Sequence, residues 1–497
     1  MASPTPMPTT VVEAKEEGVS EQKEVQKAEN TENTNPVAPQ PPYSAFSPAR
    51  KKFILSIVVA KAFIAPVSGS IYMPLLPVLA NDLDVSPALI NLTVTVFMLT
   101  FAIAPLFFAS LSDVRGRKPV YVLGLLIGIG ANVALAAAPA HYASFMVLRV
   151  VQAIGGSALF SLGAGTVVDI FEPKQRGRAI SYYSLGPQFG PILGPVIGGA
   201  IAQRTSWRWT FGFLAMFGGF CLLVSLFLLP ETLRSRVGNS EIHSGKSWIQ
   251  WPSFNQKVEL KPGQIVPRRP SRRNILVFMR HPLIMLSCIN VALLFGSYYC
   301  LAVSFPKVVE DRFGFTTAET GAAFLAPGIG MICGSILCGH LSDWRHRKHI
   351  EKTKAEEVAP ERRLHLQFIG TALFPIGVLI YGWLGNFSIG VPGLIIAMFI
   401  CGFGLSWTTS TNTTYATLVQ PGQAATLVAL GSLLRNPAAA VGAAVIDPLI
   451  GAEGFGWCFT GLAIVDLIST GIATLSLVKG PSWRKAFEEK HKGSLCR

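Results

Sequence analysis

The recurrence of long apolar runs constrains this chain more than any other feature of its sequence. From Phe53 onward, apolar runs follow one another, and at about 20 residues each is long enough to cross ~30 Å of hydrocarbon as a helix. Only 14% of the residues are charged, whereas a soluble domain carries roughly 25%. This is too small a charged fraction to cover the surface of a water-soluble protein of this length. We therefore predict an all-α membrane protein.

The runs predict twelve transmembrane helices in two groups of six. The spans are expected at 53–79, 88–111, 119–138, 143–169, 179–202, 209–229, 282–306, 318–341, 366–385, 391–418, 424–450 and 456–478. Residues 1–50 are rich in proline and glutamate and lack apolar periodicity, so we expect them to be disordered. The predicted organisation is a cytoplasmic tail (1–50), a six-helix bundle (51–231), a basic cytoplasmic linker (232–281), a second six-helix bundle (282–480) and a cytoplasmic tail (481–497).

Lysine and arginine predict the orientation of these helices. Basic residues gather before the first span at 50–52, in the loops at 115–118, 174–178 and 345–348, in the linker, and after the last span at 484–485. Such loops stay in the cytoplasm, so both termini are expected there. An odd number of spans is the alternative, and it would place a basic loop outside. The net charge of +14 is thus explained by topology, and we expect no nucleic-acid partner.

An octet after the second span is repeated after the eighth. Residues 111–118 read LSDVRGRK and residues 341–348 read LSDWRHRK, so six of the eight letters agree in register. The repeat indicates a duplicated six-helix unit in parallel orientation. Parallel repeats of this kind build transporters that rock about a site near the midplane of the membrane.

Two motifs carry a resemblance to a known family. Residues 109–118 resemble the loop Gly-x-Leu-[Ala/Ser]-Asp-[Arg/Lys]-x-Gly-[Arg/Lys]-[Arg/Lys] of the major facilitator superfamily, with departures at Ala109 and Val114. Residues 190–199 fit Gly-x3-Gly-Pro-x2-Gly-Gly, the mark of its antiporters. From about 50 to 480 the chain resembles the fungal twelve-span drug:proton antiporters, near the exporters of itaconate and citrate.

The resemblance implies a gate and a close helix contact. The loops are expected to latch the cytoplasmic gate by ion pairs, and the alternative is a solvated loop that only orients helices. The implied gate residues are Asp113, Gly116, Arg117, Lys118, Glu231, Arg234, Asp343 and Arg347. Glycines four residues apart leave a smooth helix face for another helix, and the alternative is a packing stripe with no gating role. The implied antiporter motif is Gly190, Gly194, Pro195, Gly198 and Gly199.

Polar and charged residues inside the spans are candidates for substrate and proton coupling, because they are costly in a membrane. The candidates are Lys61, Arg149, Gln152, Arg435, Asn436 and Asp466. Arg149 and Gln152 resemble the family's Arg-x-x-Gln, which implies proton coupling or substrate contact. Three cations predict a cavity suited to an anion. Two alternatives stay open: Lys61 and Arg149 reach the membrane surface, or Asp466 only braces Arg435 or a neighbour.

These features predict a transporter driven by protons. The sequence has no GxxxxGK[ST] loop for ATP, no convergent catalytic set and no metal-ligand spacing, so we predict no enzyme activity, metal or cofactor. We expect a multi-pass protein of the plasma membrane, monomeric, that exports a small organic anion such as itaconate or a related carboxylate in exchange for protons. The alternative is a multidrug or secondary-metabolite efflux pump of the same fold.

Overall fold

The fold was determined as a computed structural model, and it describes residues 43–137, 141–241, 279–353, 364–387, 390–419 and 424–491. The terminal tails before 43 and after 491, and most of the predicted linker, lie outside the described residues. The elements are α2 (Pro48–Ser70), η1 (Met73–Leu75), α3 (Leu76–Asp82), α4 (Pro87–Arg115), α5 (Arg117–Ala137), α6 (Tyr142–Ile170), α7 (Pro173–Arg204), α8 (Arg208–Phe227), α9 (Arg234–Val237), α11 (Pro282–Phe313), α12 (Thr317–Ala323), α13 (Leu325–Thr353), α14 (Gln367–Phe387), α15 (Val391–Val419), α16 (Ala424–Glu453) and α17 (Phe455–His491).

Local sequence signals set several helix ends. Ser86 precedes α4, and its hydroxyl accepts a hydrogen bond from the backbone N–H of Leu89, which satisfies one of the free donors of the first turn. Thr316 and Glu319 form a reciprocal capping box at the start of α12. At the end of α11, Gly314 adopts a left-handed conformation with φ of 66°, which favours glycine.

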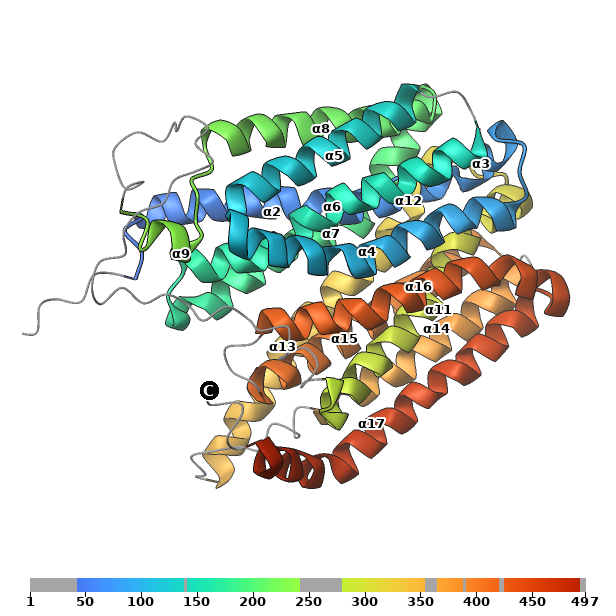
Figure 1. The fold of residues 1–497 in the computed structure, drawn as a ribbon. Helices are drawn as coiled ribbons and strands as arrows, with labels where there is room; N and C mark the ends of the chain where they lie inside the picture. The colour runs from blue at the N-terminus through green and yellow to red at the C-terminus, as the bar shows by residue number, and fades with distance from the viewer. Residues whose placement is uncertain are drawn as a thin grey trace, which may run out of the picture.

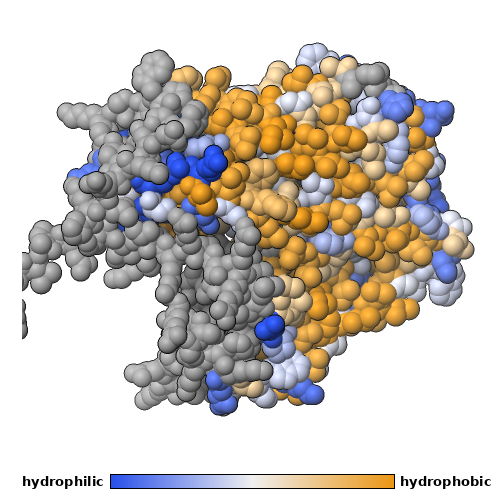
Figure 2. Space-filling view, in the orientation of Figure 1, coloured by the Kyte–Doolittle hydropathy of each residue, from blue (hydrophilic) through white to orange (hydrophobic). Residues whose placement is uncertain are grey.

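All twelve predicted spans fall on helices. Within the described residues, eleven helical segments are long and apolar enough to cross a membrane. The remaining long helix, α7, falls short because glycines, three internal prolines and polar side chains reduce its hydropathy. Figure 2 shows a broad apolar band across the face in view, with hydrophilic residues toward its two ends. A band of this kind is what a bundle exposes to lipid.

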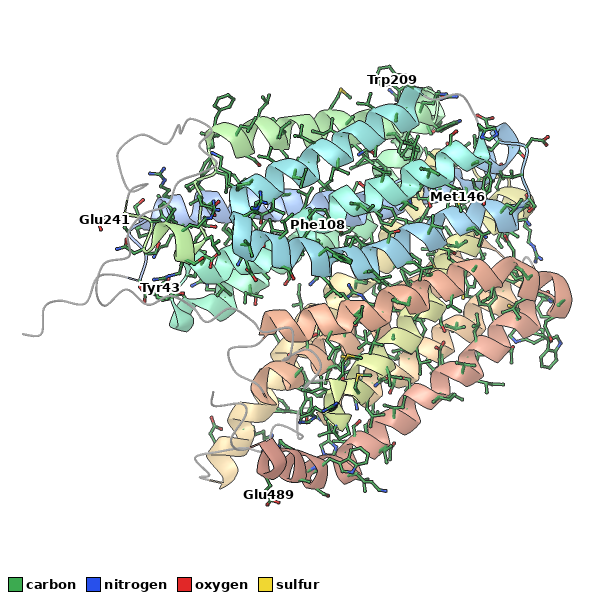
Figure 3. All side chains as sticks on the ribbon, in the orientation of Figure 1. Tyr43, Phe108, Met146, Trp209, Glu241 and Glu489 are labelled. Carbon is green, nitrogen blue, oxygen red and sulfur yellow. The ribbon has the colours of Figure 1, made fainter. Side chains whose placement is uncertain are left out.

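The helices form two halves. In the first half, α2 packs against α6 and α7, and α5 packs against α6 and α8. In the second half, α15 packs against α13 and α14, and α11 packs against α16 and α17. We call the end where α4 stops at Arg115 the basic end, and the other the opposite end. Figure 3 places Tyr43 and Glu241 at the basic end, and Met146 and Trp209 at the opposite end.

The two halves touch near the opposite end. The amide of Asn91 on α4 donates to the carboxylate of Asp447 on α16 at 2.7 Å. One turn further along α4, the hydroxyl of Thr95 donates to the carbonyl of Ala440 at 3.1 Å. On the other side of the interface α7 packs against α12 and α13. Figure 1 shows the two halves diverging toward the basic end.

Candidate transport site and gate

Arg149 on α6 lies buried between two aromatic rings. Its guanidinium carbon is 4.0 Å from the ring centroid of Tyr72 and 4.4 Å from that of Phe97. Its Nη1 donates to the carbonyl of Ser68 at 2.9 Å and to Oε1 of Gln152 at 2.5 Å. The side chain is 0% exposed, so it does not reach the membrane surface. Its Nε and Nη2 have no hydrogen-bond partner among the described residues.

Gln152 is held in turn by a residue that the sequence analysis missed. Its amide nitrogen donates to Oδ1 of Asn132 at 2.6 Å, and Asn132 donates to the carbonyl of Gly128 on its own helix at 2.7 Å. This chain of hydrogen bonds fixes the amide oxygen of Gln152 toward Arg149. The signal for Asn132 was present, because a buried amide inside the predicted span 119–138 is costly unless it is paired.

Arg435 on α16 is the second cation of the site. Its guanidinium carbon lies 4.8 Å from the ring centroid of Phe295 on α11, and its buried Nε has no partner among the described residues. The neighbouring Asn436 is buried, and its amide nitrogen is also unpartnered there. Tyr299 on α11 lies close enough to both Arg149 and Arg435 to interact electrostatically with each. One tyrosine is thus within electrostatic range of two arginines, one from each half.

Lys61 and Asp466 lie apart from this pair. The Nζ of Lys61 sits 3.3 Å from the ring centroid of Tyr121, inside the first half, and the lysine is 0% exposed. Asp466 on α17 accepts a hydrogen bond from Ser297 at 2.8 Å and forms no ion pair among the described residues. Of the three predicted cations, the two arginines thus share one tyrosine within electrostatic range, and Asp466 holds a neighbour, Ser297, and forms no ion pair with Arg435.

An ion-pair network holds the loop between α4 and α5 at the basic end. Arg117 contacts the carboxylate of Asp113 at 3.0 Å through Nη1 and that of Asp169 at 3.0 Å through Nε. Its Nη1 also donates to the hydroxyl of Ser112 at 2.6 Å. Asp169, at the end of α6, was not among the predicted gate residues, although an acid at the basic end of a span was a usable signal. Removing one partner of a buried ion pair strongly destabilises the folded protein, because the other charge is left buried without compensation.

Glu231 caps α5 instead of pairing with an arginine. Its carboxylate accepts hydrogen bonds from the backbone N–H groups of Arg117 at 2.9 Å and Lys118 at 3.2 Å. These groups form the N-terminus of α5, and a helix N-terminus favours negative charge. Lys118 donates through Nζ to the carbonyl of Leu226 at 2.8 Å. Gly116 has φ of 103°, and a Cβ atom there would collide with Glu231. A larger residue at position 116 would therefore strain the turn and displace the Glu231 carboxylate that caps α5.

Arg234 and the second copy of the octet complete the predicted gate. The guanidinium carbon of Arg234 lies 3.7 Å from the ring centroid of Tyr43, a residue that precedes the predicted bundle. In the second copy, the side chains of Asp343 and Arg347 lie outside the described residues. Its backbone differs from the first copy, because α13 continues through the octet as one helix where the first copy breaks at Gly116.

The glycine face of α7 lies against α2. A Cβ atom on Gly190 would collide with Pro66, one on Gly194 with the hydroxyl of Ser70, and one on Gly198 with a backbone carbonyl of α2. Gly199, beside Pro195, meets the backbone of α12 in the other half. The motif therefore allows close approach twice, once within the first half and once across the interface.

The sequence from 60 to 443 matches the profile of the Major Facilitator Superfamily. The chain belongs to this superfamily. It is 38% identical over 455 residues to Dityrosine transporter 1 of Saccharomyces cerevisiae, covering 86% of this chain and 79% of the relative. It is 29% identical over 484 residues to Citrate exporter 1 of Aspergillus niger, covering 91% and 90%. The fold matches a bacterial homologue of the human lysosomal transporter Spinster, with a TM-score of 0.62, 14% identity and coverage of 89% and 98%.

Membership of the family establishes the general role. The chain is a multi-pass membrane transporter that acts on small molecules, and it is not an enzyme. The predictions of an all-α membrane fold and of this superfamily are confirmed.

Proposed function

We propose that this transporter exports a small organic anion from the cytoplasm, in exchange for protons, by alternating access in the plasma membrane. One observation carries the anion assignment. Arg149 and Arg435 come from different halves, both lie within electrostatic range of Tyr299, and neither forms an ion pair among the described residues. Both retain guanidinium N–H donors without a hydrogen-bond partner there.

An anionic substrate would satisfy these donors. A buried charge without a counter-charge is costly, and so is an unmade hydrogen bond to it. A carboxylate offsets both costs, because its two oxygens match the fork of a guanidinium. The rings of Tyr72 and Phe97 lie against Arg149, and the ring of Phe295 lies against Arg435 and 5.1 Å from that of Tyr299. They favour a carboxylate carried on an apolar or aromatic body. The names of the two relatives refer to dityrosine and citrate, and both of these molecules carry carboxylates.

The arrangement of the halves fits alternating access. If the basic end is cytoplasmic, as its lysines and arginines predict, the contacts near Asn91 and Asp447 close the outer side. Export then requires these contacts to break and the basic end to close. The loop of Asp113, Gly116, Arg117 and Lys118, with Glu231 and Arg234, would form the inner gate, together with Asp343 and Arg347 of the second copy.

The test is transport by purified protein in liposomes with the basic end outside. Labelled citrate and dityrosine are the anionic probes, and a lipophilic cationic dye is the competing probe. We expect uptake of an anion that rises when the lumen is acidic and that citrate or dityrosine in excess competes away. Uptake of the dye alone would instead support the multidrug alternative. Anion uptake at a rate that does not change with the pH gradient would refute proton exchange.

A further inference from the structure

Asp466 is a buried carboxyl group in the second half that the transport site does not use. It lies on α17, eleven residues after the helix begins at Phe455, and it is 0% exposed. One oxygen, Oδ1, accepts the hydrogen bond from Ser297 on α11, and the other, Oδ2, has no partner among the described residues. An isolated carboxylate is very costly in such a place, so the group is expected to be neutral, which means that it holds a proton.

The groups that face Asp466 do not compensate a negative charge. On α16, Arg435 is directed at Phe295 and forms no ion pair with Asp466. The other titratable side chains that the structure describes in this region are two thiols in electrostatic range of Asp466 (Cys300 on α11 and Cys401 on α15), a third thiol on α17 itself (Cys458) and a phenol on α14 (Tyr381). Among the described residues, none of these groups supplies a positive charge.

A row of buried polar side chains leads from Asp466 toward the basic end. Ser469, three residues further along α17, donates to Asn290 of α11, and the next hydroxyl, that of the half-buried Thr470, donates to the carbonyl of Thr371 on α14 at 3.4 Å. Closer to the basic end, Gln367 of α14 is buried and both polar atoms of its amide lack partners among the described residues. Buried groups with spare hydrogen-bonding capacity are the sites that internal water occupies.

The α11 side of the row has the spacing of one helix face. Ser297, Asn290 and Ser287 are seven and three residues apart, so their side chains lie along one side of α11. Ser287 is buried and its hydroxyl is unpartnered among the described residues. The residues directly after Ser297 are Tyr298 and Tyr299, the second of which lies within electrostatic range of the two arginines. The helix α11 therefore joins the carboxyl group to the transport site.

We propose that Asp466 is a proton-binding site, reached along this polar row, whose occupancy controls the transport site through α11. The inference rests on the proposed exchange of the anion for protons. When the carboxylate binds a proton, its charge is removed, and the second half is stable in the conformation of this structure. When the proton leaves, the uncompensated charge favours a rearrangement that returns water to Asp466, and Ser297 moves with it. The row predicts that the proton enters and leaves from the basic end in this state.

The test separates proton coupling from transport itself. Full-length wild type, Asp466→Asn and the control Glu453→Gln, an exposed acid at the end of α16, are compared in liposomes with labelled citrate or dityrosine. Each is assayed for uptake driven by a pH gradient and for exchange of the same anion at equal pH. We expect Asp466→Asn to keep exchange while its gradient-driven uptake falls to the level without a gradient, and the control to match wild type.

The outcomes are distinguishable. Gradient-driven uptake by Asp466→Asn equal to that of wild type overturns the inference, whereas a wild type that transports neither anion overturns the proposed function. Infrared spectroscopy of the unliganded protein at neutral pH gives a readout independent of transport. A C=O band of a protonated carboxylic acid should be present in wild type and Glu453→Gln and absent in Asp466→Asn. Its absence from wild type would also overturn the inference.

A second variant covers the case in which Asp466→Asn does not fold. Asn290→Leu leaves the carboxyl group in place and interrupts the row. It should keep the infrared band and the exchange reaction and slow the gradient-driven uptake. An unchanged gradient-driven rate would exclude the row as the path of the proton.

Discussion

Replacing Arg435 by glutamine tests the anion site most directly. The change keeps a polar side chain, shorter by the guanidinium carbon and its two terminal nitrogens, and removes the positive charge beside Phe295 and in electrostatic range of Tyr299. Because Arg435 forms no ion pair among the described residues, the substitution leaves no described carboxylate without its partner. The loss should therefore appear in substrate binding more than in folding.

The size of the effect follows from the contacts available to the guanidinium. Its Nε is free of protein partners among the described residues, and a hydrogen bond between charged groups contributes about 1.5–3 kcal/mol. At about 1.4 kcal/mol for each tenfold change, Arg435→Gln should weaken carboxylate binding by about 10- to 100-fold. Arg435→Lys keeps the charge but loses the planar fork, so it should lie between glutamine and wild type.

The assay is concentration-dependent uptake of labelled citrate or dityrosine at matched amounts of protein. Arg204→Gln is the matched control, because Arg204 is exposed at the end of α7 and lies far along the chain from the site. Wild-type affinity in Arg435→Gln would refute the anion assignment. An unfolded variant would show instead that Arg435 is structural, contrary to the reasoning from its missing partner.

Three further predictions concern gating. Asp113→Asn removes one of the two carboxylates around the loop arginine, so the variant should reach the membrane and lose most transport; a wild-type rate would contradict the latch. Gly194→Leu forces α7 away from α2 and should stop transport while insertion survives. Gly219→Leu is its control, because a Cβ atom at Gly219 meets nothing within 4 Å, and equal rates in the two variants would refute the argument. Asn91→Cys combined with Asp447→Cys should cross-link the halves and block transport until a reductant is added; transport by fully cross-linked protein would show that this contact need not open.

The sequence was sufficient for the architecture because each helix is specified locally. A run of apolar residues with a cap or a glycine at its end identifies one membrane helix, as at Ser86 and Gly314. The one helix that composition describes poorly is α7, because its glycines and prolines serve contacts with other helices and lower its hydropathy. Its motif identified it where hydropathy alone is weak.

The candidate site was harder to predict because it depends on helix rotation. Sequence places Lys61, Arg149 and Arg435 in membrane spans, but not the direction in which each side chain points. The rotation of α2 turns Lys61 toward Tyr121 and away from the two arginines. Asn132 and Asp169 were missed for a related reason, since their importance comes from partners on other helices.

The contact between α7 and α12 has a thermodynamic consequence for the transport cycle. Gly199 and Gly321 meet there through backbone atoms, beside Pro195. A long side chain that is ordered each time an interface closes loses up to about 2 kcal/mol of rotamer entropy, whereas glycine loses none. A seam made of backbone can thus be formed and broken in every cycle without repeatedly ordering side chains. Its opening should consequently depend only weakly on temperature, compared with an interface that must freeze and release long side chains.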